Sequence, residues 1–511
     1  QGVRPEPKVL RPTGCRYELH LSAGETWSMS YVYAIGDSEE QATALFDRTI
    51  ESPRAQVEAA RDDWNAELAA LFTPDNDRYG GHLPRLITSD EAIRKVYWMG
   101  ALGLAYFKRD SPFSVMGRTY DTLLPRYWQS VTFLWDYFLS SPAHAQLDPG
   151  VMRKYLEHWI QADLYKHFGT EYLTGGTVGY WYSVNDYAMT SMIRDYVRWT
   201  GDHEWLGKVI EGTDRPIIDF LVDFALHWKT LPNLEGVADY GGIDNLLECV
   251  SAYVHGVASL NAANVFNMRN AAELLQMVGQ HERAAELSAE AERLLPAVKA
   301  LYVEGSGHFA TRLPDGSKRE VRHCYDFLTV LNTISDDLTP EIRNEMVGYF
   351  NRELRSETWM YALSPEDENV LYDVRPDHQW TGAYPAWPPE SARGLFRIGA
   401  NDVAIDYLRS LARTANQGVF GQAHFADTVV PQEAGGAMKC HPHMPCITDW
   451  ACSSTGSYVN AVIEGLFGVR ATPGAGISAQ PQFGDDFDPE ARLVDLEYQG
   501  RRYTVTREGL T

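Results

Sequence analysis

The sequence has 511 residues, of which 44% are hydrophobic and 22% are charged, proportions that indicate a folded globular chain. Its 45 basic and 69 acidic residues give a net charge of -24, which disfavours nucleic acid and anionic membrane surfaces as partners. No apolar run reaches the roughly 20 residues that cross a bilayer, so we expect a soluble protein. The sequence leaves open whether it is cytoplasmic, periplasmic or secreted.

The N-terminal part, residues 1–36, contains the alternating segment RYELHLSAGETWSMSYVY. Alternation on both sides of Ala23 and Gly24 predicts two half-buried strands joined by a turn. Because an isolated hairpin is marginally stable in water, we assign 1–36 to the end of an N-terminal β domain whose earlier strands would precede Gln1. The alternative is that the hairpin packs against the C-terminal strands. Residues 37–85 turn helical and charged, and are predicted to form a linker helix and loop.

Helical periodicity dominates residues 86–468. Thr88 and Glu91 have the spacing of a capping box before an apolar stripe, which predicts the first helix there. About twelve helical segments follow, joined by alternating short and long loops, and this order favours a toroid of helical hairpins with the long loops at one end. The exceptions are a hairpin predicted at Asp315–Gly316 and two C-terminal strands predicted around Gly500.

The long loops of this region combine aromatic rings with carboxylates. They read RYWQSVTFLWDYF, TGGTVGYWYSVNDY, VADYGGIDNLLE, HQWTGAYPAWPPE and QAHFADTVVPQEAGG. Faces of Trp and Tyr stack on the C–H surfaces of sugars, while Asp, Glu and Asn bind their hydroxyl groups. Core packing explains any single ring more simply, but five loops of one composition favour a cleft for a neutral carbohydrate.

Cleavage of a glycosidic bond requires two carboxyl groups that flank it, one as acid and one as base or nucleophile. The loop carboxylates that could serve are Asp136, Asp186, Asp239, Asp244, Glu248, Glu390, Glu433 and Asp449. Residue type alone does not select two of them.

Four segments resemble motifs of the (α/α)6-barrel, or six-hairpin, glycosidases. They are FLWDYF, YGGIDN followed by SLNAANVFNMRNAAELL, WTGAYPAWPPESARGL, and PQEAGG followed by TDWACSSTGSYVNAVIEGLFGVR. The resemblance is nearest to glycoside hydrolase family 63 and extends to families 37, 65, 78 and 94, all of this inverting type. It implies a mainly α fold: an (α/α)6 toroid as the catalytic domain at 86–468, flanked by the end of a β-sandwich domain at 1–36 and a β segment at 469–511.

The same resemblance implies which carboxyl groups act. Asp244 matches the general acid in the turn before a long helix, although an N-cap role would also suit an Asp at this place. Glu433 matches the general base, and Glu248 and Glu390 are the alternates. The expected activity is an exo-acting, inverting glycoside hydrolase, either α-glucosidase-like or α-L-rhamnosidase-like.

We expect substrate contacts from aromatic and polar residues of the same loops. They are Trp135, Asp136, Trp181, Tyr182, Asn185, Asp186, Trp380, Tyr384, Trp387 and Trp450. No metal or organic cofactor is expected. The cysteines and histidines of KCHPHMPCITDWAC match no usual zinc spacing and are interpreted as reduced thiols in a loop. The oligomeric state is open, a homo-oligomer included.

Two alternatives remain at this point. A glycoside phosphorylase would use phosphate in place of water and would need a cationic or serine-rich pocket, for which HPH and Ser453–Ser454 near Glu433 are candidates. A non-catalytic carbohydrate-binding protein would keep the cleft without turnover. A polysaccharide lyase is a weaker alternative, because a chain of charge -24 is poorly suited to an anionic sugar.

Overall fold

The computed structural model describes residues 18–124, 131–242, 250–372, 382–414, 424–425 and 451–511. The chain divides into two units, Gln1–Ala66 and Glu67–Thr511, each of which is described by itself. In the described residues, no helix combines the length and apolar character that crossing a membrane requires.

The first unit contains α1 (Glu39–Glu51) and most of α2 (Pro53–Ala70). Ser38 caps α1 by accepting a hydrogen bond from the backbone N–H of Gln41, and Pro53 opens α2, a position where its missing N–H is not needed. The predicted linker is therefore helical, but as two helices.

Residues 18–36 differ from the prediction. The turn at Ala23–Gly24 is present, but no strand is assigned in 18–36. The apolar side chains that would form the buried face, such as Leu21, Tyr31 and Tyr33, are exposed. A hairpin gains its stability from neighbours that cover such a face, and the described part of this unit supplies none. The assignment of 1–36 to a β domain stays a prediction.

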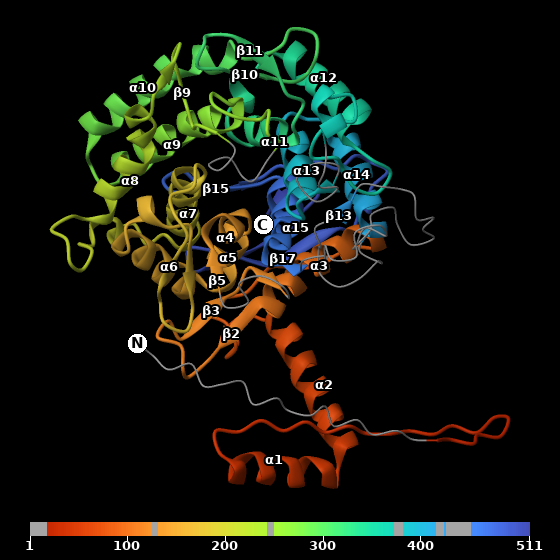
Figure 1. Cartoon of the computed structure of the whole chain (residues 1–511). Helices are drawn as coiled ribbons and strands as arrows, with labels where there is room; N and C mark the ends of the chain where they lie inside the picture. Colours follow the sequence, from red (N-terminus) through yellow and green to blue (C-terminus); the bar gives the residue numbers. More distant parts are fainter. Residues whose placement is uncertain (1–17, 125–130, 243–249, 373–381, 415–423, 426–450) are drawn as a thin grey trace. The chain divides into compact units, whose positions relative to one another are not determined.

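In the second unit, helices form an inner and an outer ring (Figure 1). The inner ring consists of α4 (Leu134–Leu139) with α5 (Ser141–Leu147), α7 (Asn185–Thr200), α9 (Ala258–Met277), α11 (Cys324–Thr333), α13 (Trp387–Arg397) and α15 (Ser457–Asn460), with η9 (Ser453–Gly456) before α15 and η10 (Ala461–Leu466) after it. The outer ring consists of α3 (Glu91–Phe107), α6 (Pro149–Gln161), α8 (Ile217–Leu226), α10 (His281–Lys299), α12 (Pro340–Tyr349) and α14 (Asn401–Thr414). Neighbouring inner helices contact one another around the ring, and α15 closes it against α5. The predicted (α/α)6 toroid is confirmed.

The two rings bury their side chains differently. The outer helix α10 buries one stripe, Ala284, Leu287, Ala291, Leu294 and Val298, with the spacing of a single helical face. The inner helix α11 buries every residue from Cys324 to Asn332. A helix that is covered on all sides belongs in the centre of a domain, so the core of this unit lies within and around the inner ring.

Two turns of the chain agree with their local sequence, whereas the N-cap of α3 is a different residue from the predicted one. The hairpin at Asp315–Gly316 joins β10 (Ala310–Arg312) to β11 (Lys318–Glu320). Gly279 follows α9 with a φ of 77°, as a helix stop requires. The N-cap of α3, however, is Asp90, whose carboxylate accepts from the N–H of Ile93 at 3.0 Å. Thr88 instead donates to the Asp488 carboxylate at 3.0 Å.

The predicted C-terminal strands are present as β17 (Arg492–Tyr498) and β18 (Arg501–Thr506), on either side of Gly500. They belong to a four-stranded antiparallel sheet in the order β1-β17-β18-β19, completed by β1 (Arg85–Ile87) and β19 (Gly509–Leu510). A second pair, β15 (Val469–Thr472) and β16 (Gly476–Ala479), precedes this sheet.

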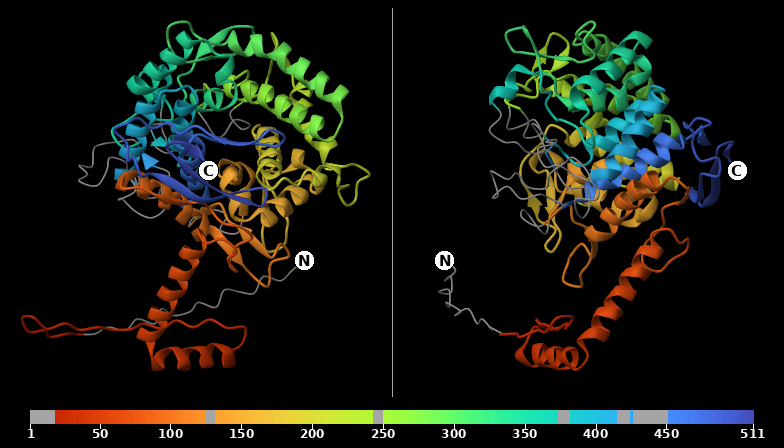
Figure 2. Two further views of the ribbon diagram at one scale, coloured as in Figure 1. Left: turned by 180° about the vertical axis from the view of Figure 1, so that it is seen from behind. Right: turned by 90° about the vertical axis from the view of Figure 1, so that its right-hand side faces the viewer.

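The C-terminal strands lie at one end of the helical ring (Figure 2). The backbone N–H of Gln499 donates to the carbonyl of Trp199, near the end of α7, at 3.0 Å. Arg198 donates to the carbonyl of Ala471 in β15 at 3.4 Å. The C-terminal strands therefore contact the C-terminal end of α7. The N-terminal end of α7 lies on the opposite side of the ring.

Candidate functional site

Three of the predicted binding residues converge where two inner helices begin. Trp135 lies in the first turn of α4, Trp387 begins α13, and Tyr384 precedes it by three residues. The Trp135 ring stacks on Tyr384 with centroids 5.0 Å apart and an interplanar angle of 24°. Its centroid lies 6.2 Å from that of Trp387.

The beginning of α11 adds two rings that the sequence interpretation missed. Tyr325 lies 6.5 Å from Trp135 and 6.0 Å from Trp387, and His323 meets Trp387 edge-on at 5.6 Å. We call Trp135, His323, Tyr325, Tyr384 and Trp387 the aromatic cluster. His323 and Tyr325 belong to the segment RHCYDF, which has the same mixture of rings and a carboxylate as the other loops. That composition was the signal that could have found them.

The aromatic cluster carries hydrogen-bond donors as well as ring faces. The indole Nε1 atoms of Trp135 and Trp387 are buried and have no acceptor among the described residues. The Nδ1 atom of His323 accepts from the backbone N–H of Tyr325 at 3.2 Å, so the neutral ring carries its proton on Nε2. Rings that offer N–H groups beside apolar faces match the two kinds of surface that a sugar presents.

The buried carboxyl group of Asp326 supports the aromatic cluster through hydrogen bonds. Asp326 accepts from the hydroxyl of Tyr253 at 2.6 Å and from the backbone N–H of Ser259 at 2.7 Å. Tyr253 in turn stacks on His323 at 4.7 Å. Burial raises the pKa of Asp326 to about 7, although these hydrogen bonds oppose the shift. The group therefore joins the start of α9 to the start of α11.

Asp136, predicted to bind substrate, is buried in the first turn of α4 beside Trp135. Cys452 lies close to it: burial raises the pKa of the thiol, and the charge of Asp136 raises it further. Cys452 ends β14 (Ala451–Cys452), which pairs with β4 (Leu123–Leu124). Asp136 thus borders both the aromatic cluster and the strand that leads into η9.

Four further predicted binding residues, Trp181, Tyr182, Asn185 and Asp186, lie at or just before the start of α7. Asp186 accepts from Nδ1 of His227 at 2.8 Å, and the ring of Trp181 meets His227 edge-on at 5.3 Å. Burial raises the pKa of Asp186, and the bond to His227 opposes the shift. With Nδ1 bound to Asp186, the neutral His227 ring presents Nε2 as an acceptor. No motif marks His227, which follows the outer helix α8, so sequence reasoning missed it.

Two neighbours of Asp186 are engaged within the fold. The side-chain amide of Asn185 donates to the carbonyl groups of Leu164 at 3.1 Å and His167 at 2.8 Å. The ring of Tyr182 lies 6.2 Å from that of Phe168. A role of either residue in substrate binding stays a prediction.

Asp244 and Glu248 lie outside the described residues, but both ends of their segment are described. Gly241 accepts from the backbone N–H of His255 at 2.8 Å, and Tyr240 donates to the His255 carbonyl at 3.2 Å. His255 has a left-handed φ of 64° and is held by Asp239 through a contact of 2.9 Å to Nδ1. The chain before and after 243–249 is therefore joined at one point, directly ahead of α9.

Glu433, Trp380 and Trp450 also lie outside the described residues, as do Cys440, His441, His443 and Cys446. On one side of 426–450, β13 (His424–Phe425) pairs with β12 (Gly382–Ala383), which immediately precedes Tyr384. On the other side, β14 ends at Cys452, the thiol beside Asp136. One described flank of Glu433 thus pairs with the strand that precedes Tyr384, and the other ends at Cys452, whose thiol senses the charge of Asp136.

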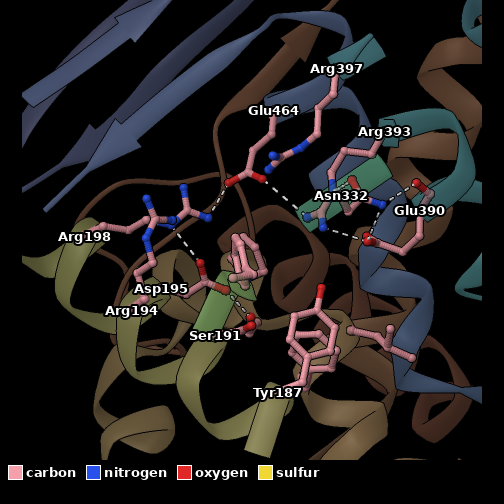
Figure 3. Close-up of a pocket in the computed structure, with 15 residues that line it drawn as sticks. Tyr187, Ser191, Arg194, Asp195, Arg198, Asn332, Glu390, Arg393, Arg397 and Glu464 are labelled. Atoms are coloured by element: carbon pink, nitrogen blue, oxygen red, sulfur yellow. Dashed lines mark hydrogen bonds and ion pairs between the residues drawn. The ribbon is translucent and has the colours of Figure 1, made fainter. Parts of the chain in front are cut away.

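Glu390, the alternate base, is directed elsewhere. It lies one turn into α13 and pairs with Arg393 at 2.7 Å. Burial raises its pKa to about 7 against the opposing charge of Arg393. Arg393 also contacts Glu464 at 3.4 Å, and Glu464 pairs with Arg198, which holds Asp195 at 2.7 Å (Figure 3). We call Asp195, Arg198, Glu390, Arg393 and Glu464 the ion-pair network.

The sequence matches no protein family model and no curated protein. Among solved structures, the fold is similar to that of a sialidase, with a TM-score of 0.64, 14% identity, and coverage of 86% of this chain and 39% of the other. It is also similar to a GH78 family rhamnosidase of Bacillus sp. GL1, with a TM-score of 0.58, 13% identity and coverage of 83% and 40%. A third is an α-L-rhamnosidase of Streptomyces avermitilis complexed with L-rhamnose, with a TM-score of 0.54, 13% identity and coverage of 84% and 36%.

At these identities the likeness shows the fold alone. It supports the (α/α)6 glycosidase architecture and does not single out family 63. The chain spans 36% to 40% of the length of these three proteins.

Proposed function

We propose that the chain is an exo-acting, inverting glycoside hydrolase whose aromatic cluster holds the terminal sugar. The observation that carries the proposal is the convergence of Trp135, Tyr384 and Trp387, with two buried indole N–H groups, at the beginnings of α4 and α13. Stacked rings would cover the C–H face of a sugar, and the N–H groups would bind its hydroxyl oxygens. Asp136 and the Asp186–His227 pair would add acceptors for hydroxyl protons.

The proposed general acid is Asp244 and the proposed general base is Glu433. Support for Asp244 comes from the anchoring of its flanks by His255 and from Tyr253, which stacks on His323 of the aromatic cluster. Support for Glu433 comes from its flanking strands, which adjoin Tyr384 and Asp136. An inverting enzyme would hold the two carboxyl groups roughly 6.5–9.5 Å apart, with room for a water between sugar and base. Glu390 is less suited to be the base, because its carboxylate is buried and already paired with Arg393.

The preferred substrate class in this proposal is an α-L-rhamnoside, followed by an α-glucoside. Two of the similar structures are rhamnosidases, and one of them holds L-rhamnose. The α-glucoside rests on the sequence resemblance to family 63.

The test is release of monosaccharide from a panel of α-L-rhamnosides and α-glucosides by the purified chain. Asp244→Asn and Glu433→Gln should each lower kcat by about 10²–10⁴-fold, because each removes proton transfer in the transition state. Asp214→Asn and Glu304→Gln are matched controls at exposed positions and should leave kcat unchanged. NMR of the first product should show the anomer opposite to that of the substrate.

Other outcomes would change the assignment. Activity that survives Asp244→Asn or Glu433→Gln would move the chemistry to Glu248 or Glu390. Turnover that depends on added inorganic phosphate and yields a sugar 1-phosphate would identify a phosphorylase. Binding of rhamnose without turnover, unaffected by Asp244→Asn, would identify a carbohydrate-binding protein.

A further inference from the structure

One arginine inside the helical ring has no hydrogen-bond or ion-pair partner in the described part of the chain. Arg397 is the last residue of α13, and its Nε atom is buried without a hydrogen-bond acceptor. Among the described residues, no carboxylate lies within ion-pair distance of its guanidinium. Its side chain points toward Glu464 (Figure 3), but that carboxylate is already engaged by Arg198 and Arg393. Arg397 as a whole is partly buried, and of its five N–H donors the buried Nε–H is left without an acceptor, which is costly.

Arg397 lines a cavity that it shares with the ion-pair network. The cavity has a volume of about 40 Å³ and lies between α7, α13 and η10. One water-sized particle requires roughly 10–15 Å³ by the same measure, so the cavity has room for a small ion and a water. Its lining also includes Asn332 and Ser191, and the hydroxyl of Ser191 has no partner among the described residues.

Three of the four arginines that line the cavity are paired with carboxylates. Arg194 contacts Glu273, outside the lining, at 2.9 Å. Arg198 pairs with Asp195 and Glu464, and Arg393 pairs with Glu390 and Glu464. Arg397 is therefore the one arginine of the lining that has no ion-pair partner among the described residues.

The pKa values of Arg397 and Glu464 reflect their neighbouring charges. Burial and the charges of Arg393 and Arg470 lower the pKa of Arg397 to about 9. Burial tends to raise the pKa of Glu464, but the charges of Arg198 and Arg393 outweigh it and lower that pKa to about 2. The network thus keeps Glu464 ionised. The positive charges near Arg397, in contrast, disfavour its charged form.

We propose that this cavity binds a small monovalent anion, chloride in ordinary salt solution, through the guanidinium of Arg397. The anion pairs with the charge of Arg397 and accepts its guanidinium N–H groups. A monatomic ion suits the volume, whereas phosphate has five heavy atoms and a second negative charge that would approach Glu390 and Glu464. This site is separate from the aromatic cluster, and the inference does not rest on the proposed glycosidase activity.

The test is thermal unfolding of the full chain at constant ionic strength while sodium methanesulfonate is replaced stepwise by sodium chloride. Constant ionic strength removes general screening from the comparison. Binding to the folded state should raise Tm saturably, by about 1–3 °C. Broadening of the chloride NMR line by the protein should saturate over the same concentrations. A wild-type chain that shows neither effect would overturn the proposal.

Arg397→Met should remove both effects. In chloride-free buffer it should be at least as stable as the wild type, because it removes a partly buried charge that has no ion-pair partner among the described residues. Arg413→Met, on the exposed side of α14, is the matched control and should respond to chloride like the wild type. Chloride binding that persists in Arg397→Met would contradict the assignment, as would a larger Tm rise with phosphate than with chloride at equal ionic strength.

If Arg397→Met does not fold, bromide in a crystal of the wild-type chain decides the question. An anomalous peak within hydrogen-bond distance of Arg397 would support the site. The absence of such a peak in the cavity would overturn it.

Discussion

The two ends of α13 differ in how they use the helical ring. At its beginning, Trp387 belongs to a group of rings held by stacking and edge contacts. From the next turn onward, Glu390 and Arg393 belong to a group of charges held by ion pairs. The helix α7 repeats this arrangement, with Asp186 at its start and Arg198 near its end. One set of inner helices thus carries the aromatic cluster at its beginnings and the ion-pair network further along.

This comparison teaches where substitutions should affect stability and where they should affect function. Charges in the interior are favourable only while every partner remains, because an unpaired buried charge is costly. Rings at the helix beginnings can lose a polar atom at little cost to folding, since their packing persists. The predictions below follow this division from the largest expected effect to the smallest.

The strongest disruption should come from Glu464→Gln. It leaves Arg198 and Arg393 without their shared carboxylate, and breaking such a buried pair costs about 3–5 kcal/mol. Urea unfolding measures this loss, and Glu304→Gln at an exposed position is the control. A loss of less than about 1 kcal/mol would mean that the network does not hold the inner helices together.

Asp326→Asn tests the carboxyl group that joins the start of α9 to the start of α11 behind the aromatic cluster. Burial raises its folded pKa to about 7 from the ordinary Asp value of 3.8, so the folded state retains a proton that the unfolded state releases. Its contribution to stability is complete below about pH 4 and is lost as pH rises to about 7, by on the order of 2–4 kcal/mol. The Asn oxygen can still accept from Tyr253 and Ser259.

Stability should therefore depend less on pH between 4 and 7 in Asp326→Asn than in the wild type, and should be higher at pH 7. Thermal unfolding across this range measures both. An unchanged pH dependence would show that Asp326 is ionised in the folded protein at neutral pH.

Trp135→Phe should have the smallest effect on folding and a selective effect on binding. It keeps a ring against Tyr384 but removes the buried indole N–H. If the proposed function holds, KM should rise about 10-fold, the effect of losing about 1.4 kcal/mol of binding, with little change in Tm.

The matched control is Trp159→Phe, since Trp159 lies fully buried on α6 and donates its N–H to Thr170 at 2.9 Å. It should lower Tm and leave KM unchanged. Equal effects of the two substitutions on KM would argue against a role of the aromatic cluster in binding.

Much of the fold could be predicted because helical periodicity is local. The hairpin at Asp315–Gly316 and the turn at Gly500 each depend on neighbouring residues, and the structure has them where the sequence indicates. The N-cap of α3 moved from Thr88 to Asp90 because Thr88 is engaged by Asp488, 400 residues away. The strands at 18–36 were not found, because alternation predicts a strand only where neighbours cover its face.

The candidate site was predictable only where composition marks it. Loops rich in rings and carboxylates indicated Trp135, Tyr384 and Trp387, which the structure brings together. The ion pair between Arg198 and Glu464 joins residues 266 positions apart and has no local signature. The sequence analysis missed His227 for the same reason. Its partner Asp186 was predicted to bind substrate, but the contact between α7 and the end of α8 forms only in the tertiary structure.

The closure of the ring has a consequence for how the chain can fold during synthesis. Ser140 donates to the carbonyl of Ser453, and Asn460 donates to that of Leu139, contacts that span 313 and 321 residues. A stack of helical repeats that stays open can stabilise itself pair by pair as it leaves the ribosome, because each repeat contacts only its neighbours. Here the first helical hairpins form part of their contacts with the last ones. A nascent chain therefore keeps an apolar edge exposed until α15 emerges.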